Sequence, residues 1–124
     1  MSQPTDALQA ALQGEYASIF GYGQAAGRLT GSQLALARID LDAHRGRRDR
    51  LRALVVDASA TPTAAAPEYL LGDVRTAAAA RDALAGIEMR LAATYADLVA
   101  ASTGPVRTLA ITALQESTIR AARL

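Results

Sequence analysis

Six side chains that could do acid–base or ligand chemistry fall on the inward positions of four helical patterns. They are Glu15, His44, Arg48, Glu88, Glu116 and Arg120. Residues that recur every three or four positions mark the face of a helix that turns to the core, and Glu15 continues the series of Leu8 and Leu12. Carboxylates and an imidazole in one core can bind a metal ion or form a buried hydrogen-bonded network. We therefore expect a buried polar site at the middle of the molecule.

The apolar periodicity and the end signals define the helices that must position this site. Within one domain spanning residues 1–124 we expect helices at about 5–29, 32–58, 76–102 and 105–122. The short link Thr30-Gly31 makes the first two helices antiparallel neighbours. No segment alternates with period two, so the expected fold class is an all-α four-helix bundle.

The connector SATPTAAAPEYLLGDVR, residues 59–75, predicts the topology. Its two prolines and its glycine break any regular period. About 17 extended residues span roughly 55 Å, whereas a helix of about 26 residues is only about 39 Å long. The connector can therefore run the length of the bundle. We expect an up-down-down-up order, with the long crossover between parallel second and third helices.

Four glycines interrupt the first helical pattern, namely Gly14, Gly21, Gly23 and Gly27. Each glycine inside a helix costs about 0.5–1 kcal/mol relative to alanine. Close approach of a neighbouring helix, or room for a group beside Glu15, would offset that cost. A dinucleotide-binding glycine loop is disfavoured because it requires a preceding strand.

Composition excludes several classes of protein. The chain has no cysteine, which removes disulfides, thiolate catalysis and iron–sulfur ligation. Its net charge of +1 gives no overall field that favours nucleic acid. It shows no membrane-spanning run and no signal peptide at its start, so a cytoplasmic location is expected. Alanine-rich outer faces favour a homodimer.

Two segments resemble a known family. Residues 15–23 read EYASIFGYG and residues 44–49 read HRGRRD, and the similarity extends through the connector segment AAAPEYLLGDV and residues 95–98, YADL. The chain resembles the uncharacterised alanine- and arginine-rich ferritin-like domains of actinobacterial type. It departs from their pattern at Tyr16, where they have histidine, and at Phe20, where they have tyrosine. The resemblance implies the ferritin-like fold and no established activity.

The ferritin-like fold raises the question of metal. Its di-iron sites take one carboxylate from each of two helices and a Glu-x-x-His pair from each of the other two. Here Leu41 stands in place of one glutamate and Ile119 in place of one histidine. A guanidinium beside a vacant ligand position can supply the missing positive charge, so we expect Glu15 to pair with Arg48. The alternative is iron or manganese bound by Glu15, His44, Glu88 and Glu116.

The leading hypothesis is therefore a ferritin-like bundle with an incomplete ligand set, no cofactor, and a binding or structural role. Enzymatic activity stays open, a non-enzymatic role is favoured, and no catalytic residue is assigned. The rival is a metal-binding protein or metal-dependent oxidoreductase. A weaker alternative is DNA association through the run from Arg45 to Arg52, although Asp49 at helical spacing favours a solvated face there.

Overall fold

The computed structural model describes residues 3–124, which form four long helices and no strand. These are α1 (Pro4–Ala25), α2 (Gly31–Asp57), α3 (Ala77–Ala101) and α4 (Gly104–Arg123), with the short 3-10 helix η1 (Ala26–Arg28) after α1. The expected all-α class is confirmed. The first helix is shorter than expected, because its last turn tightens into η1. None of the helices in the described part of the chain is long and apolar enough to cross a membrane.

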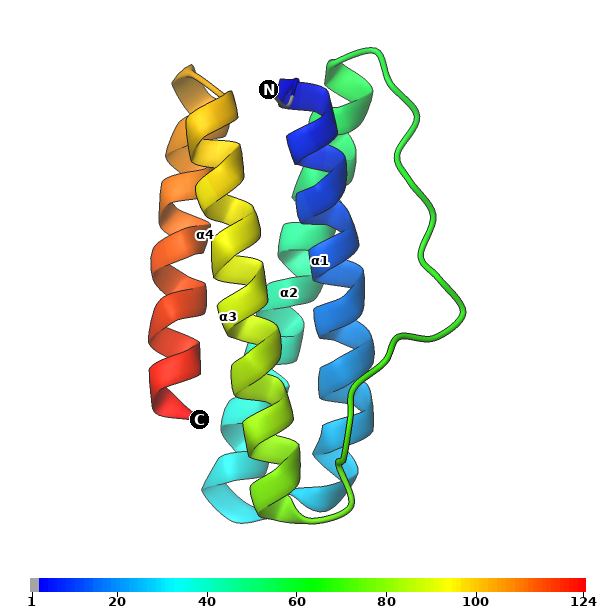
Figure 1. Cartoon of the computed structure of the whole chain (residues 1–124), viewed down its shortest axis with the longest axis vertical. Helices are drawn as coiled ribbons and strands as arrows, with labels where there is room; N and C mark the ends of the chain where they lie inside the picture. Colours follow the sequence, from blue (N-terminus) through cyan, green and yellow to red (C-terminus); the bar gives the residue numbers. More distant parts are fainter. Residues whose placement is uncertain (1–2) are drawn as a thin grey trace.

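The four helices form an up-down-down-up bundle (Figure 1). α1 and α2 are antiparallel, and the connector then runs from one end of the bundle to the other, outside α1. α3 consequently starts at the end where α2 started, and the two helices are parallel (Figure 1). The order predicted from the connector's length is confirmed.

The helix starts follow the local sequence, with two corrections. Thr76 caps α3 as expected, because its hydroxyl accepts a hydrogen bond from the Ala79 backbone N–H at 3.1 Å. The start of α1 is earlier than the expected residue 5: Pro4 opens the helix, and Gln3 is its N-cap. Proline fits a first helical turn because its missing N–H would be unsatisfied there. α2 starts at Gly31, one residue before the expected start, and its N-cap is Thr30.

The connector is held against α1 by hydrogen bonds from α1 side chains. Gln9 accepts from the Thr63 backbone N–H at 2.8 Å, and Tyr16 donates to the Thr63 carbonyl at 3.0 Å. Tyr69 of the connector donates to Gln13 at 3.0 Å. These bonds satisfy polar groups of a segment that has no ladder or helix of its own.

The apolar core is divided into two clusters. The first lies toward the start of α1 and the end of α2, and includes Leu12, Leu51, Tyr95 and Leu98. The second lies toward the other end, and includes Tyr22, Leu29, Ala37, Leu84 and Ile87. The buried polar residues His44 and Glu88 fall between the two clusters along α2 and α3, and Glu15 lies at the inner edge of the first cluster, beside Tyr16.

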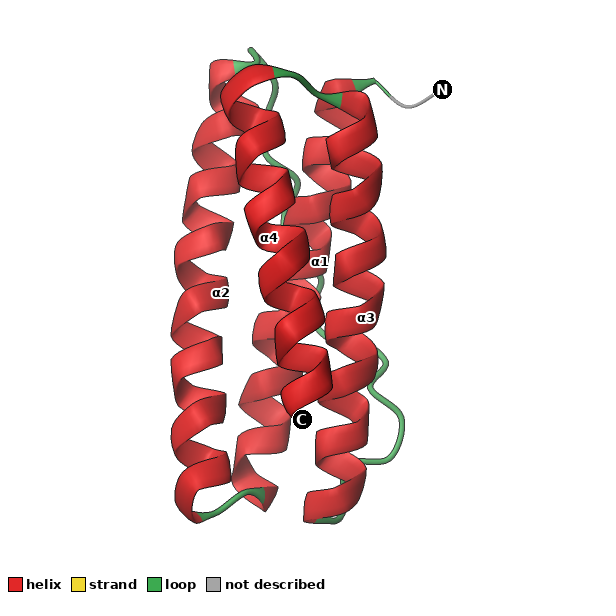
Figure 2. Cartoon of the chain, turned by 90° about the vertical axis from the view of Figure 1, so that its left-hand side faces the viewer, coloured by secondary structure: helices red, strands yellow, loops and turns green. Residues whose placement is uncertain are grey.

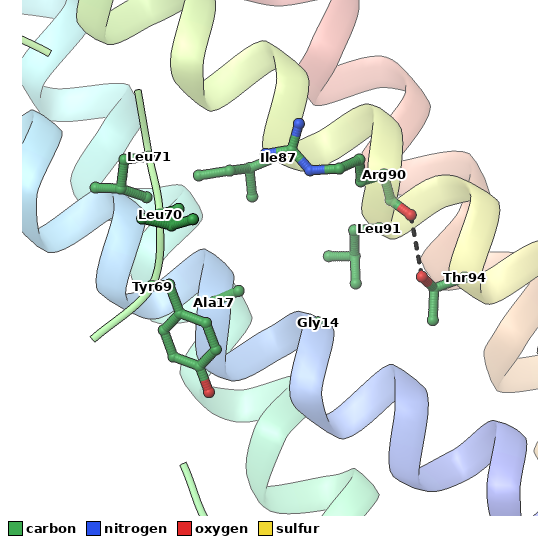
Figure 3. Close-up of a pocket in the computed structure, with 9 residues that line it drawn as sticks. All are labelled: Gly14, Ala17, Tyr69, Leu70, Leu71, Ile87, Arg90, Leu91 and Thr94. Carbon is green, nitrogen blue, oxygen red and sulfur yellow. Dashed lines mark hydrogen bonds between the residues drawn. The ribbon is translucent and has the colours of Figure 1, made fainter. Parts of the chain in front are cut away.

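Two of the four glycines in the first helical pattern permit close packing on α3. A Cβ at Gly14 would lie 2.6 Å from Leu91 Cδ1, and one at Gly21 would lie 2.3 Å from Ile87 Cδ1. Figure 3 shows Gly14 and Ala17 of α1 facing Ile87 and Leu91 of α3. Close helix approach, one of the two explanations offered for the glycines, is confirmed at these positions. Gly23 and Gly27 have open space beside them, so packing does not explain them.

The helix pairs are not packed equally. α1 packs closely on α2 and on α3, and α3 packs closely on α4. α2 and α4 also run side by side but lack such close backbone approach (Figure 2). Long charged side chains connect them instead: Arg47 of α2 donates to Glu116 of α4 at 2.7 Å, and Arg123 of α4 donates to Asp40 of α2 at 2.7 Å.

Candidate functional site

The centre of the bundle holds one histidine between two carboxylates. His44 Nδ1 on α2 lies 2.6 Å from Glu15 Oε1 on α1, and its Nε2 lies 2.9 Å from Glu88 Oε2 on α3. The three residues are 1%, 1% and 0% exposed. The histidine therefore ties α1, α2 and α3 together at one level, out of contact with water.

Two buried tyrosines add hydrogen bonds to the carboxylates. Tyr95 of α3 donates to Glu15 Oε2, and Tyr22 of α1 donates to Glu88 Oε2 at 2.6 Å. The Tyr22 ring also packs against the imidazole, with ring centroids 5.2 Å apart. Each carboxylate thus faces one ring nitrogen and one phenol, which gives charge-assisted hydrogen bonds in a dry environment.

The environment sets the charge of His44. Burial alone would lower its pKa, because burial disfavours the charged imidazolium. The hydrogen bonds with Glu15 and Glu88, together with their negative charges, outweigh burial and raise the pKa from 6.5 to about 9. His44 is therefore an imidazolium at neutral pH and donates from both ring nitrogens. Burial, reinforced by the adjacent carboxylates, raises the pKa of Tyr22 and Tyr95 well above its usual value, so both phenols stay protonated.

The cluster continues from Tyr22 toward the surface. The Tyr22 hydroxyl lies 3.4 Å from Asp40 Oδ2. Asp40 is 3% exposed and accepts from Arg123 at 2.7 and 2.9 Å. Arg120 Nε lies 3.6 Å from the same carboxylate. Two guanidiniums from α4 thus compensate this third buried carboxylate, which lies on α2.

Two buried oxygen atoms of the cluster region, Glu88 Oε1 and Ser117 Oγ, have no hydrogen-bond partner in the described part of the chain. The two residues are equally far from the turn that joins α3 to α4. Glu88 lies 13 positions before Ala101, the last residue of α3, and Ser117 lies 13 positions after Gly104, the first residue of α4. In an antiparallel pair this equal spacing puts the two residues at the same level. A buried polar atom left without a partner costs about 1–3 kcal/mol.

The structure brings together three of the six residues singled out in the sequence, namely Glu15, His44 and Glu88. Arg120 does not contact these three residues directly. It pairs with Asp40, the next carboxylate of the cluster, and its side chain is 13% exposed. Glu116 lies outside the cluster, because its side chain is 38% exposed and bonds Arg47 and Arg120.

The expected pair between Glu15 and Arg48 is not formed. Arg48 donates to its neighbour Asp49 at 2.9 Å, and its side chain is 32% exposed. Glu15 has His44 as its cation instead. Arg48 lies four residues after His44, but α2 is turned so that the face carrying the histidine, and not the arginine, points at α1.

The rotation of α4 also differs from the expected one. Ile119, which occupies the position of a ferritin-like histidine in the sequence pattern, is 62% exposed. The buried positions on this helix are Ala110, Ala113 and Ser117, and Arg120 follows on the same side. At this level of α4 the inward residues are therefore Ser117 and Arg120. Arg120 is one of the expected inward residues, whereas Ser117 takes the place expected of Glu116, a shift of one residue or about 100° of helical rotation.

This donor set does not fit a two-metal centre. Among residues 3–124, no group of three or more histidine and acidic side chains is arranged to hold a metal ion. A metal-bound imidazole must be neutral and have a free nitrogen, whereas both His44 nitrogens face carboxylates. α4 brings Ser117 and Arg120 to the cluster where a ferritin-like site would have a glutamate and a histidine.

Sequence reasoning missed three members of the cluster: Asp40, Tyr22 and Tyr95. The two tyrosines continue the apolar series of their helices, but a buried phenol usually needs a hydrogen-bond partner. Asp40 lies one turn before His44 and bonds the α4 arginines. The useful indication was spacing, because Asp40 and His44 are four residues apart and share one helix face.

The arginine run on α2 is largely neutralised by neighbours. Arg45 donates to Asp42 at 3.1 Å, and Arg52 donates to the Tyr16 hydroxyl at 2.6 Å. Arg47 and Arg48 have acidic partners as described above. Arg50 and Arg52 have no acidic partner in the described part of the chain, and Arg52 is bonded only to a neutral hydroxyl.

An apolar pocket lies elsewhere, between the connector, α1 and α3 (Figure 3). Its volume is about 270 Å³, and Leu70, Leu71, Ile87 and Leu91 contribute to its lining. Arg90 is the charged residue at this pocket. The pocket does not open onto His44 or its partners.

Four helices, a long crossover and inward carboxylates on α1 and α3 define a ferritin-like four-helix bundle. A solved structure of a ferritin-like, diiron-carboxylate protein from Bacillus anthracis supports this fold, with a TM-score of 0.76, 15% sequence identity, and coverage of 99% of this chain and 93% of that one.

Residues 7–124 match the model of a family described as a domain of unknown function, DUF4439. The chain belongs to this family. It is also similar to the solved structure of a conserved hypothetical protein, rv2844, from Mycobacterium tuberculosis, with 33% identity, a TM-score of 0.93, and coverage of 97% of this chain and 92% of that one. The resemblance to uncharacterised ferritin-like domains of actinobacterial type is thereby confirmed. The comparison with curated proteins gave no match.

Proposed function

We propose that this chain is a non-enzymatic, metal-free member of the ferritin-like fold, in which a protonated histidine occupies the charge position that metal ions fill in diiron-carboxylate relatives. One observation carries the proposal: both ring nitrogens of the buried His44 are bonded to carboxylates, Glu15 at 2.6 Å and Glu88 at 2.9 Å. The imidazolium supplies one positive charge between two negative ones, and no vacant ligand position remains on it.

The proposed role of the cluster is to fix how three helices are placed relative to one another. Buried ionic groups favour one arrangement, because any slip of α1, α2 or α3 leaves a charge without its partner. The outer faces of the bundle are then held in a fixed geometry and can serve binding. The two apolar clusters on either side supply the driving force for folding.

Nuclear magnetic resonance of the single histidine tests the proposal directly. His44 is the only histidine in the chain, so long-range proton–nitrogen spectra contain one ring. At neutral pH both ring nitrogens should show the shifts of a protonated imidazolium. A neutral ring, or a ring whose signals change on adding one equivalent of iron, manganese or zinc, would contradict the proposal.

Elemental analysis of protein purified without chelators is the second test. We expect no stoichiometric iron, manganese or zinc, and no rise in melting temperature when these metals are added. Two equivalents of metal per chain that are lost in Glu15→Gln would support a two-metal oxidoreductase. One equivalent that is lost in both Glu15→Gln and Glu88→Gln would support a single-metal binding protein.

Homodimer formation is a separate proposal. Ile39 on α2 and Ile119 on α4 are 63% and 62% exposed, and burial in a second copy would remove this apolar surface from water. Light scattering coupled to size exclusion gives the mass. A monomer at all concentrations would reject the dimer without affecting the proposal for His44.

A further inference from the structure

A second polar site lies on the α2–α4 side, outside the histidine cluster. It is a cleft of about 320 Å³, lined by Ala43, Gly46, Arg47, Arg50, Glu116 and Arg120. The cleft exists because α2 and α4 lack the close packing of the other neighbouring helix pairs. Arginine side chains, rather than apolar ones, form much of its wall.

The charges in this cleft do not balance. Arg47 and Arg120 share one carboxylate, that of Glu116, at 2.7 and 3.5 Å. Arg50 lines the same cleft and has no acidic partner among residues 3–124. Three guanidiniums therefore face one carboxylate in the cleft, and Arg120 is further shared with Asp40 at 3.6 Å. The cleft has an excess of about two positive charges.

Gly46 lies in the middle of α2, and no packing contact requires it. A Cβ at this position would meet nothing within 4 Å. A glycine in a helix interior costs about 0.5–1 kcal/mol relative to alanine. Gly46 lines the cleft beside Arg47 and Arg50, where a missing side chain leaves the floor open to a bound group.

We propose that this cleft binds a small molecule through a phosphate monoester group. A phosphate monoester carries about two negative charges at neutral pH and has several acceptor oxygens, which matches the excess charge and the planar donors of Arg47, Arg50 and Arg120. The volume exceeds what a bare phosphate needs, so the organic part of the ligand would lie over Ala43 and Gly46.

A nucleic acid also carries phosphate groups, but it fits this cleft less well than a small phosphate monoester does. The other arginines of the run lie outside the cleft and are engaged by their own neighbours, Arg45 by Asp42 and Arg52 by Tyr16. A backbone-tracking surface would need these cations free along the helix. The concave site with one free arginine favours a small ligand.

Titration with phenyl phosphate and with inorganic phosphate, followed by backbone amide spectra, tests the proposal. Sodium chloride at matched ionic strength is the control. Phenyl phosphate should shift the amides of Ala43 and Gly46 and should bind more tightly than inorganic phosphate. Shifts that the chloride control reproduces, or shifts spread over all arginines, would overturn the proposal.

A matched pair of charge variants locates the site. Arg50→Gln should weaken phenyl phosphate binding by about tenfold or more, because it removes a charge-assisted contact. Arg38→Gln makes the same change in charge at an exposed position of the same helix, and should leave the affinity within about twofold. Equal losses in the two variants would show a general ionic effect and reject the cleft.

Gly46 provides an occlusion test that keeps every charge. Gly46→Leu should fill the cleft floor and abolish binding, whereas Gly46→Ala should retain most of it. Far-ultraviolet circular dichroism and thermal unfolding verify that both variants fold. Unchanged binding in a folded Gly46→Leu protein would overturn the proposal. Retention of duplex DNA that falls with salt and is equally weakened by Arg38→Gln and Arg50→Gln would favour the nucleic-acid alternative instead.

Discussion

The charged residues on the two sides of α2 differ in their exposure to water and in how many of them have a partner of opposite charge. Toward α1 and α3, His44 is closed off from water, and each of its ring nitrogens has one carboxylate partner. Toward α4, Arg47 and Arg50 line an open cleft in which positive charge exceeds negative charge. One side is a closed network whose charged groups are hydrogen-bonded to one another, and the other is an accessible surface with an excess of positive charge.

This difference indicates how the two sides respond to change. In a closed network, the loss of one member leaves its partner charged and buried, and this lowers the free energy of unfolding of the whole protein. On an open surface, water replaces a lost partner, so stability changes little while affinity for an anion changes much. The following predictions test that contrast, from the largest expected effect to the smallest.

His44→Gln should cause the largest loss of stability. It leaves Glu15 and Glu88 buried without the cation between them, and we expect the free energy of unfolding to fall by about 3–5 kcal/mol. Urea unfolding followed by circular dichroism measures it. The matched control is Arg48→Gln on the same helix, where the partner Asp49 is exposed and the expected change is within about 0.5 kcal/mol.

Double-mutant cycles sharpen the same point. Glu15→Gln combined with His44→Gln should be much less destabilising than the sum of the single changes, because the two groups interact directly. Glu15→Gln combined with Arg48→Met should be additive within about 0.5 kcal/mol. A strong coupling of Glu15 to Arg48 would restore the pairing expected from the sequence and refute the geometry given above.

Stability should depend on pH through His44. Its pKa is raised from 6.5 to about 9 in the folded state, so the stabilising contribution is complete below pH 6.5 and is lost as the pH rises toward 9. A pKa difference of this size corresponds to about 3 kcal/mol. Urea unfolding across this pH range should show the decline, and His44→Gln should flatten it. A wild-type protein equally stable at both ends of the range would contradict the imidazolium.

Tyr95→Phe should have an intermediate effect. It removes the phenol that donates to Glu15 Oε2 and leaves that buried oxygen without a donor, at a cost of about 1–3 kcal/mol. Tyr69→Phe removes a hydroxyl from the connector, where water can reach Gln13, and should cost less than about 1 kcal/mol. Thermal and urea unfolding of both variants give the comparison, and equal losses would argue against a closed network.

Two glycine-to-alanine changes should give the smallest effects on stability, and Gly46→Ala should be the more stable of the two variants. Gly46→Ala on the open side should stabilise the protein by about 0.5–1 kcal/mol, because nothing lies within 4 Å of the new methyl group. Gly14→Ala on the closed side places a methyl group 2.6 Å from Leu91 Cδ1 and forces that side chain to move. The second variant should be less stable than the first by about 1 kcal/mol or more. The reverse order would mean that the α1–α3 interface adapts without strain.

The sequence by itself determined the helices, their order and part of the site. Helical periodicity and end signals located the four helices to within a few residues, and the length of the connector required the crossover. The same periodicity placed Glu15, His44 and Glu88 inward, because each sits near the middle of a long apolar series where a one-residue error is corrected by many neighbours.

Only the tertiary structure decided which charged groups meet. Along α4, Glu116 and Ser117 differ by about 100° of rotation, and a short series with alanine on several faces does not distinguish them. The packing of Ala110 and Ala113 against α3 sets that rotation, which turns Ser117 inward and Glu116 toward Arg47. On α2, packing turned His44 rather than Arg48 toward Glu15. Partner choice depends on rotations of about one residue, which are fixed by close packing between helices and not by the pattern within any one of them.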